Sequence, residues 1–265
     1  MSTYLCAYYQ DPDVILKSNL TDLIVCSVHF GMQDSEPYIH LNDSAPDSEV
    51  NQVMWRSALA SQLRCHVMIG GAGKAFQTMF GNNMFATYFE LLARMLDEYA
   101  FIGSVDLDVE EDVFIDDVVV LIQSLKSEFP MLKVTMSCLA MDLVYPHNHG
   151  IGGFCYTDLV AKVGDQIDMY HAQAYDDSFS VEALQAILNQ NLIPVNKLCF
   201  GMMSSQTTSA LRQVYNMSQL GLAGFFVWNY HDMPPNWPDQ ILAAQTTPPP
   251  PTNIMSSLST WCSLL

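Results

Sequence analysis

The chain has 265 residues, half of them apolar and only 14% charged, which is typical of a globular protein and not of a disordered one. Its 28 acidic residues against 10 basic ones give a formal net charge of −18, and such a charge repels phosphate groups. Nucleic acids and anionic membranes are therefore not expected as partners. No apolar stretch reaches the roughly 18 to 20 residues that a membrane span requires.

Short apolar runs alternate with longer helical patterns along the chain. Near-continuous apolar strands separated by helices are typical of a parallel sheet covered on both faces. The strands are predicted at residues 4–9, 23–30, 66–70, 104–109, 133–138, 166–175, 197–202 and 224–229. The intervening helices are predicted at residues 49–63, 83–99, 113–128, 181–188, 208–220 and 237–244.

This alternation predicts an α/β protein, a single-domain (β/α)8 TIM barrel over residues 1–245, because a chain of this length fits that size class. Residues 246–265 open on Thr-Thr followed by four prolines, which cannot continue a helix. They are predicted to form a C-terminal tail outside the barrel.

The cysteines and the N-terminus bear on the compartment. The seven cysteines form no CxxC pair and lie mainly in apolar runs, so we expect reduced core thiols in a cytoplasmic protein. The first nine residues lack a basic region and a cleavage site, and therefore predict no signal peptide. The alternative is a secreted protein whose signal lies outside this sequence.

The predicted fourth strand carries three acids, Asp106, Asp108 and Glu110, which alternate with Val and Leu. Residues two apart on a strand point to the same side, about 6.6 Å apart along it. The carboxyl groups therefore share the inner face of the barrel, and Glu110 lies nearest the C-terminal mouth, where barrel enzymes keep their chemistry. Mutual repulsion raises at least one pKa in such a row. A carboxyl group kept protonated near neutral pH is what a general acid for glycosidic cleavage needs, and its position favours Glu110.

Two other interpretations of the acidic row remain. A solvated acidic edge would not need strict alternation with apolar residues. A calcium loop of the EF-hand type lacks its glycine here, but a magnesium site assembled from several barrel strands stays possible.

Together with these acids, several segments carry a resemblance to glycoside hydrolase family 18, the chitinases and endo-β-N-acetylglucosaminidases. Residues 103–110 resemble the DxxDxDxE signature of that family, and residues 68–71 (MIGG) resemble its SxGG motif. Residues 173–176 (QAYD) resemble its sixth-strand motif, and residues 224–228 (GFFVW) its eighth strand. The resemblance covers residues 4 to about 245.

The resemblance implies a retaining endo-glycosidase acting on β-1,4-linked N-acetylglucosamine by substrate-assisted catalysis, without metal or organic cofactor. Glu110 would act as general acid and base, while Asp108, supported by Asp106, would orient the substrate's acetamido group. The remaining site residues that it implies are catalytic Tyr175 and substrate-binding Tyr8, Gln173, Asp176 and Trp228. Of the neighbours Tyr8 and Tyr9, alternation lets only one point inward, and we favour Tyr8. The substrate would be chitin, a chitooligosaccharide or the chitobiose core of an N-glycan.

Two positions depart from the family pattern, since Gly103 replaces the first aspartate of DxxDxDxE and Met68 replaces the serine of SxGG. The loss at residue 103 is expected to weaken the support of the acidic row. The runner-up is therefore a chitinase-like lectin that binds the same sugars with little or no turnover, and a third class is a metal-dependent barrel enzyme. Only a few residues follow Met202 before the next predicted helix, so no chitinase insertion domain is expected there, and the cleft should be shallow and open.

Overall fold

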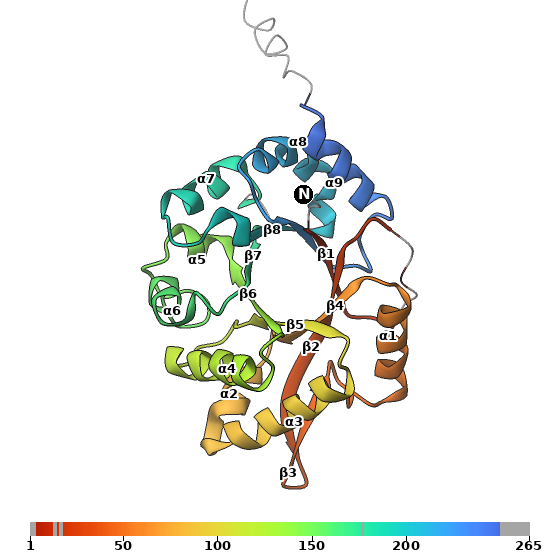
Figure 1. Cartoon of the computed structure of the whole chain (residues 1–265), viewed down its shortest axis with the longest axis vertical. Helices are drawn as coiled ribbons and strands as arrows, with labels where there is room; N and C mark the ends of the chain where they lie inside the picture. The colour runs from red at the N-terminus through yellow and green to blue at the C-terminus, as the bar shows by residue number, and fades with distance from the viewer. Residues whose placement is uncertain (1–3, 13–14, 16–17, 176–177, 250–265) are drawn as a thin grey trace, which may run out of the picture.

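A closed parallel barrel forms the centre of the molecule (Figure 1). The computed structural model describes residues 4–12, 15, 18–175 and 178–249. In this part of the chain eight strands run parallel, and β1 pairs with both β2 and β9, which closes the sheet. These strands are β1 (Tyr4–Tyr9), β2 (Asp22–Gln33), β4 (Arg64–Gly70), β5 (Ile102–Asp108), β6 (Lys133–Leu139), β7 (Met169–Gln173), β8 (Leu198–Met203) and β9 (Gly224–Trp228). The predicted (β/α)8 fold is confirmed.

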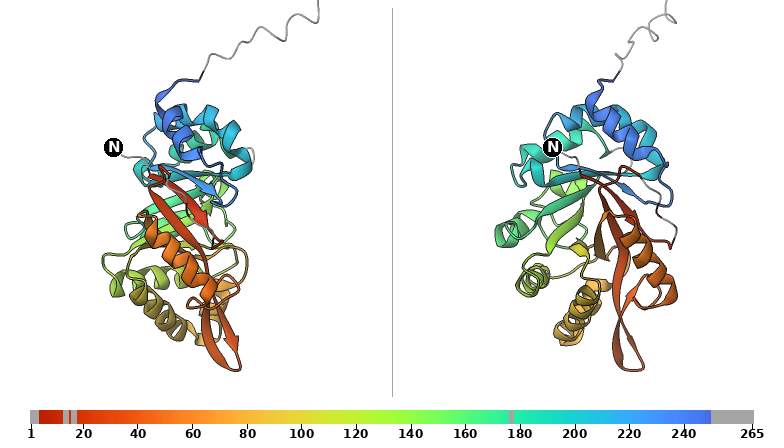
Figure 2. Two further views of the ribbon diagram at one scale, coloured as in Figure 1. Left: turned by 90° about the vertical axis from the view of Figure 1, so that its right-hand side faces the viewer. Right: turned by 45° about the vertical axis from the view of Figure 1, so that its right-hand side comes forward.

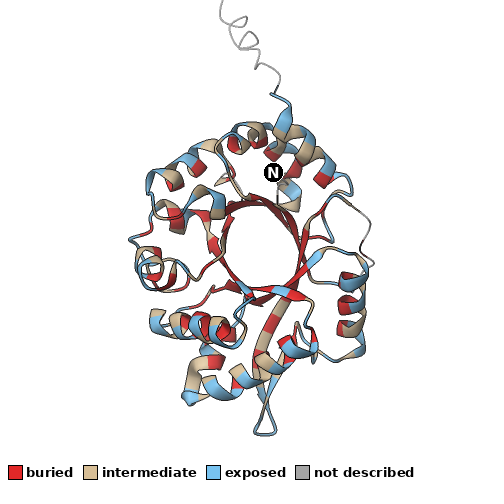
Figure 3. Ribbon diagram, in the orientation of Figure 1, coloured by how far each residue is buried: buried red, intermediate tan, exposed pale blue. Residues whose placement is uncertain are grey.

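A ring of helices covers the outside of the barrel, and each helix turns its buried residues toward the strands (Figure 3). The helices are α1 (Glu49–Ala60), α2 (Ala75–Phe80), α3 (Phe85–Glu98), α4 (Ile115–Glu128), α5 (Ala140–Val144), α6 (Tyr156–Val163), α7 (Val181–Asn189), α8 (Thr207–Ser218) and α9 (Trp237–Thr246). Short 3₁₀ turns lie at Gly81–Asn83, Val195–Lys197 and Ser204–Gln206. Among the described residues, no helix combines the length and apolar character needed to cross a bilayer.

Three helices and one hairpin escaped the sequence prediction. The helices α2, α5 and α6 have eight residues or fewer, too few turns for a periodic apolar pattern to stand out. Strand β2 continues beyond its barrel portion, turns at Asp34 and Ser35, both with positive φ, and returns as the antiparallel strand β3 (Glu36–Leu41). This hairpin projects from the side of the barrel (Figures 1 and 2).

The predicted strand 166–175 is longer than the observed β7. The carboxylate of Asp168 accepts hydrogen bonds from the backbone of Val134 at 2.9 Å and from Lys126 at 2.6 Å, which fixes this residue just before the strand. The other barrel strands were predicted to within a few residues of their ends.

Alternation along the strands separates two apolar clusters. The larger one lies between the barrel and its helices. The smaller one lies inside the barrel and consists of Cys6, Tyr8, Ile24, Cys26, Met68, Cys199 and Phe226, with Tyr4, Met169, Tyr175 and Trp228 packed against it. The described cysteines are all free thiols.

Close packing inside the barrel depends on a glycine in β8. A Cβ atom added to Gly201 would lie 1.9 to 2.2 Å from the ring of Phe226, which occupies that space from the neighbouring strand β9. Since Phe226 is fully buried, its ring has no free volume into which it could move.

We therefore expect Gly201→Ala to lower the free energy of unfolding by about 1 to 3 kcal/mol, through overpacking. Gly81→Ala is the matched control, because nothing lies within 4 Å of a Cβ atom at that position. Urea denaturation of both variants measures the difference. Equal stabilities would contradict the packing described here.

Candidate active site

Strand β5 places its acids in a row along the inside of the barrel. Asp106 is fully buried, Asp108 is 5% exposed, and Glu110, just beyond the end of the strand, is half-buried. The row thus runs from the barrel interior to the C-terminal mouth, as the alternation predicted.

Asp106 is held by donors from three other strands. Its Oδ1 accepts hydrogen bonds from the hydroxyl of Thr135 and from Nδ1 of His171 at 2.9 Å. Its Oδ2 accepts from the Ser137 hydroxyl at 2.7 Å and from the Tyr8 hydroxyl at 3.0 Å. Each carboxylate oxygen therefore has two partners, which a buried anion requires.

Asp108 has a different environment. Its Oδ1 accepts one hydrogen bond from Nε2 of Gln173 at 3.0 Å. The end of β4 lies close against its backbone, because the amide of Gly71 donates to the Asp108 carbonyl at 2.8 Å. A Cβ atom at Gly70 would lie 2.3 Å from that carbonyl oxygen, and both glycines have positive φ. The glycine pair therefore allows β4 to end against the middle of the acidic row.

These environments separate the pKa values of the three acids. For Asp106, burial alone would raise the pKa, but the interaction with His171 and the hydrogen bonds from His171, Thr135 and Ser137 outweigh it, so the pKa is lowered. Burial, then Glu110 and Asp106, raise the pKa of Asp108 well above its ordinary value. Burial also raises the pKa of Glu110, and the Gln173 amide opposes this. The row can thus hold an anion at its inner end and protons nearer the mouth.

Aromatic side chains from two strands adjoin this row. Tyr8 points inward and its ring lies 5.3 Å from that of Trp228, whereas Tyr9 points outward and packs on Tyr230, so Tyr8 is the inward-pointing residue of the pair. Tyr175 is partly buried and packs against the same inner cluster. Burial and then the charges of Asp108 and Glu110 raise the pKa of its hydroxyl. Asp176 lies outside the described residues.

Sequence reasoning missed the partners of the acids. Thr135 and Ser137 alternate on β6, and His171 lies two residues before Gln173 on β7, so all of them face inward with the row. The same alternation that found the acids would have found these residues. The sequence analysis also missed Glu111. Its carboxylate accepts hydrogen bonds from the backbone N–H groups of Phe76 and Gln77 at the start of α2, at 2.7 and 3.1 Å. Those bonds fix the loop that carries Glu110.

Gly103 lies away from the hydrogen bonds that hold the acidic row, and the weakening expected from it stays a prediction. Gly103 is exposed at an irregularity near the start of β5, and a Cβ atom there would have as its nearest neighbours the carbonyl of Cys65 and the ring of His66, at 3.7 Å. Asp106 lies deeper in the barrel and takes its hydrogen bonds from other strands. Met68 pairs in register with Asp106 and offers no hydrogen-bond donor, so β1, β6 and β7 supply the donors instead.

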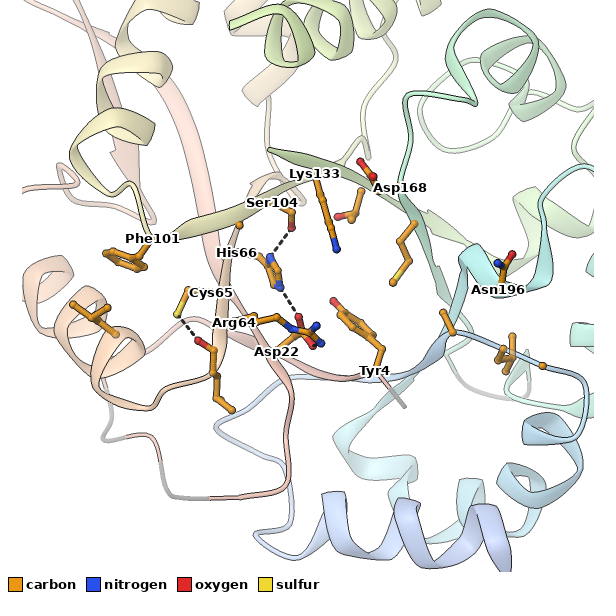
Figure 4. Close-up of a pocket in the computed structure, with 18 residues that line it drawn as sticks. Tyr4, Asp22, Arg64, Cys65, His66, Phe101, Ser104, Lys133, Asp168 and Asn196 are labelled. Atoms are coloured by element: carbon orange, nitrogen blue, oxygen red, sulfur yellow. Dashed lines mark hydrogen bonds and ion pairs between the residues drawn. The ribbon is translucent and has the colours of Figure 1, made fainter. Parts of the chain in front are cut away.

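A cavity of about 710 Å³ lies at the opposite, amino-terminal end of the barrel (Figure 4). A buried chain of hydrogen bonds forms part of its wall, in which Ser104 contacts Nδ1 of His66 and Nε2 of His66 contacts Asp22, both at 2.7 Å. Arg64 also binds Asp22, at 2.6 Å. Barrel enzymes carry out their chemistry at the carboxyl-terminal end of the strands, so this cavity is not part of the candidate active site. Among the described residues, no group of three or more His, Cys, Asp or Glu side chains is placed to hold a metal ion.

Known proteins resemble this chain in structure but not detectably in sequence. No family model and no curated protein matches the sequence. Among solved structures, a fungal endo-β-N-acetylglucosaminidase from glycosyl hydrolase family 18 superposes with a TM-score of 0.76 at 22% identity, over 91% of this chain and 95% of that one. The chain has the fold of glycoside hydrolase family 18.

The other solved structures with this fold include a chitinase and an agglutinin. A chitinase from Aspergillus fumigatus matches with a TM-score of 0.74 at 21% identity, over 88% of this chain and 93% of that one. A chitinase-like agglutinin from Robinia pseudoacacia matches with a TM-score of 0.66 at 12% identity, over 91% of this chain and 99% of that one. The fold implied by the sequence motifs is therefore confirmed, and enzymes and a lectin-like protein share it.

The opposite pKa shifts predict opposite effects of removing each charge. Asp106 has a lowered pKa, so its ionised form stabilises the fold above the unfolded value of about 3.9, and this contribution is lost as the pH falls through the folded value. Asp108 has a raised pKa, so its ionisation destabilises the fold as the pH rises from about 3.9 through the folded value.

Asp106→Asn should therefore destabilise the protein at pH 7 by about 3 kcal/mol, whereas Asp108→Asn should stabilise it by about 1 kcal/mol. The amide introduced by Asp108→Asn would keep an acceptor oxygen for Gln173. The Asp108→Asn difference should shrink as the pH is lowered toward 4, whereas the Asp106→Asn difference should persist to about pH 4 and shrink only below it, as measured by urea unfolding from about pH 7 to about pH 3. Effects of the same sign for the two variants would refute the assigned charges.

Proposed function

We propose that the protein is a retaining endo-glycosidase that cleaves β-1,4-linked N-acetylglucosamine, with Glu110 as general acid and base. The observation that carries this proposal is the graded acidic row, in which Asp106 is fixed as an anion, while Asp108 and Glu110 have raised pKa values. Glu110 is half-buried at the mouth, and its raised pKa means that it keeps its proton to a higher pH than a free glutamate does, which suits it to protonating a leaving oxygen.

The proposed reaction uses the substrate's own acetamido group as nucleophile. Glu110 protonates the glycosidic oxygen while the acetamido carbonyl attacks the anomeric carbon, giving an oxazolinium ion. Asp108 orients the acetamido group, because its carbonyl oxygen accepts a hydrogen bond from the acetamido N–H, and this hydrogen bond stabilises the positive charge that develops on the oxazolinium ion. Water activated by Glu110 then opens the ring with retention of configuration.

Three further side chains support the handling of the sugar. Gln173 donates to Asp108 at 3.0 Å and also interacts with Glu110, so it fixes the spacing between these acids. Tyr175 lies near both acids, as its pKa shift reflects, and its hydroxyl would donate to the acetamido oxygen. Trp228 is half-buried over Tyr8 and would stack beneath the sugar ring.

The natural substrate is proposed to be chitin, a chitooligosaccharide or the chitobiose core of an N-glycan. The connection between β8 and α8 consists of the single 3₁₀ turn Ser204–Gln206, so no insertion domain deepens the site there. An open site accepts a branched glycan as well as a linear polymer. Digesting colloidal chitin and a high-mannose glycoprotein side by side identifies which is cleaved.

A chitinase-like lectin is the second candidate. Two observations favour it. The fold is similar to that of an agglutinin, and Met68 on β4 places a thioether beside Asp106 of the neighbouring strand β5. Such a protein would bind the same sugars without useful turnover.

The assay that separates the two is fluorophore release from chitobiose and chitotriose glycosides. Glu110→Gln should lower the rate by at least about 100-fold, since general acid–base catalysis contributes that much, while sugar binding persists. Glu128→Gln, an exposed acid at the end of α4, is the matched control and should keep full activity. A chelator should have no effect.

Binding without release by the wild-type protein would favour the lectin. Release that a chelator abolishes would favour a metal-dependent enzyme and overturn the proposal.

The stacking role of Trp228 gives a separate prediction. Trp228→Ala should weaken binding of chitotriose by about tenfold, which corresponds to about 1.4 kcal/mol, because the sugar loses its aromatic platform. Trp228→Phe should recover most of the affinity. Calorimetric titration measures both, and an unchanged affinity for Trp228→Ala would exclude the platform.

A further inference from the structure

A fully buried histidine lies at the inner end of the acidic row. His171 and Asp106 are both fully buried, and His171 Nδ1 lies 2.9 Å from Asp106 Oδ1. An ionised carboxylate can only accept hydrogen bonds, so Nδ1 carries a proton toward Asp106 in either protonation state of the ring.

The orientation of His171 is fixed on its other side as well. Its Nε2 lies 3.2 Å from the hydroxyl of Tyr4, and the Tyr4 ring stacks on the imidazole at 5.7 Å with an interplanar angle of 14°. The rings of Phe226 and Tyr8 pack against it edge-on. The imidazole therefore cannot turn away from Asp106 without displacing these aromatic rings.

Tyr4 connects this histidine with the cavity at the amino-terminal end of the barrel, because Tyr4 is one of the residues that line the cavity (Figure 4). Thr135 also lines that cavity and donates directly to Asp106. Two of the four side chains that donate to Asp106, His171 through Tyr4 and Thr135 directly, thus connect the inner end of the row to this cavity, on the side opposite to the proposed sugar site.

The other titratable groups around the pair cannot replace His171. They are Tyr4, Cys6 and Tyr8 on β1, Cys26 on β2, Asp108 on β5, Cys138 on β6, Tyr175 after β7, and Cys199 on β8. Burial raises the pKa of each of the thiols and phenols, so they stay neutral at neutral pH. Within the part of the chain that the structure describes, His171 is the side chain in contact with Asp106 that can bring a positive charge to it.

We propose that His171 is a positioning residue that keeps Asp106 ionised and thereby leaves the shared proton of the row on Asp108. Two carboxyl groups on neighbouring inward positions do not ionise independently. With Asp106 fixed as the anion, the proton resides on Asp108, next to Glu110 and the mouth. The catalytic part of this inference rests on the proposed glycosidase function.

The first test is the pH profile of kcat/KM for chitotriose glycoside hydrolysis. Removing the His171 donor should raise the pKa of Asp106, so the acid limb of the His171→Leu profile should move to higher pH by about one unit. His171→Asn should move it in the same direction by less, because an amide can donate near the position of Nδ1 but carries no charge.

His66→Leu is the matched control. This substitution also removes a buried histidine that binds an aspartate inside the barrel. That aspartate is Asp22, and His66 does not contact Asp106. It should lower stability without moving the acid limb. An unmoved limb in both His171 variants, or an equal shift in His66→Leu, would overturn the proposal. If His171→Leu does not fold, the His171→Asn profile decides.

The second test does not need turnover, so it remains informative if the protein proves to be a lectin. The thermal midpoint of the more soluble His171 variant should lie furthest below that of the wild type at neutral pH, and the gap should close as the pH falls and Asp106 becomes protonated. In an Asp106→Asn background the same substitution should cause a shift that does not vary with pH. A pH-dependent shift in that background would show that His171 acts on another group.

Discussion

A carboxylate with no access to water needs hydrogen-bond donors in fixed positions, and Asp106 imposes this requirement on the centre of the barrel. Tyr8, Thr135, Ser137 and His171 come from β1, β6 and β7, far apart in sequence, and converge on its two oxygens. Since each donor must lie at hydrogen-bonding distance, the relative register of these strands is constrained by one side chain. A shift of one residue would turn the donors outward.

The same constraint distributes charge along β5. The donors from β1, β6 and β7 bind Asp106, whereas among the described residues Asp108 receives a side-chain hydrogen bond from the amide of Gln173 alone and has a raised pKa. Glu110 lies beyond the end of the strand, where burial is partial, and its loop is fixed by the bonds of Glu111 to the start of α2. The gradient from a lowered pKa inside to raised pKa values toward the mouth follows from which strands end where. That gradient supports the proposed acid chemistry more directly than the fold does, because enzymes and an agglutinin share the fold.

The two ends of the barrel interior differ in character. At the mouth, acids adjoin Tyr8 and Trp228, and the glycine pair Gly70–Gly71 lets two strands meet without side chains between them. At the amino-terminal end, Asp22, His66 and Ser104 bind one another beside an open cavity. In between lies an apolar layer that includes Met68 and Phe226, and it is crossed by the column of Tyr4, His171 and Asp106 and by Thr135, which lines the cavity and donates to Asp106.

The sequence alone determined the strand order, the (β/α)8 closure and the inward row Asp106–Asp108–Glu110, because alternation of apolar and polar residues is a local signal that survives without knowledge of neighbours. It did not reveal the short helices, the β2–β3 hairpin or the contact of His171 with Asp106, because His171 resembles any other buried histidine when its strand is considered alone. Only the tertiary structure decided which side chains meet Asp106 and where Gly103 lies, since those contacts depend on the register between strands up to 167 residues apart, as Tyr4 and His171 are. Register is a property of the closed barrel, and no single segment of the chain encodes it.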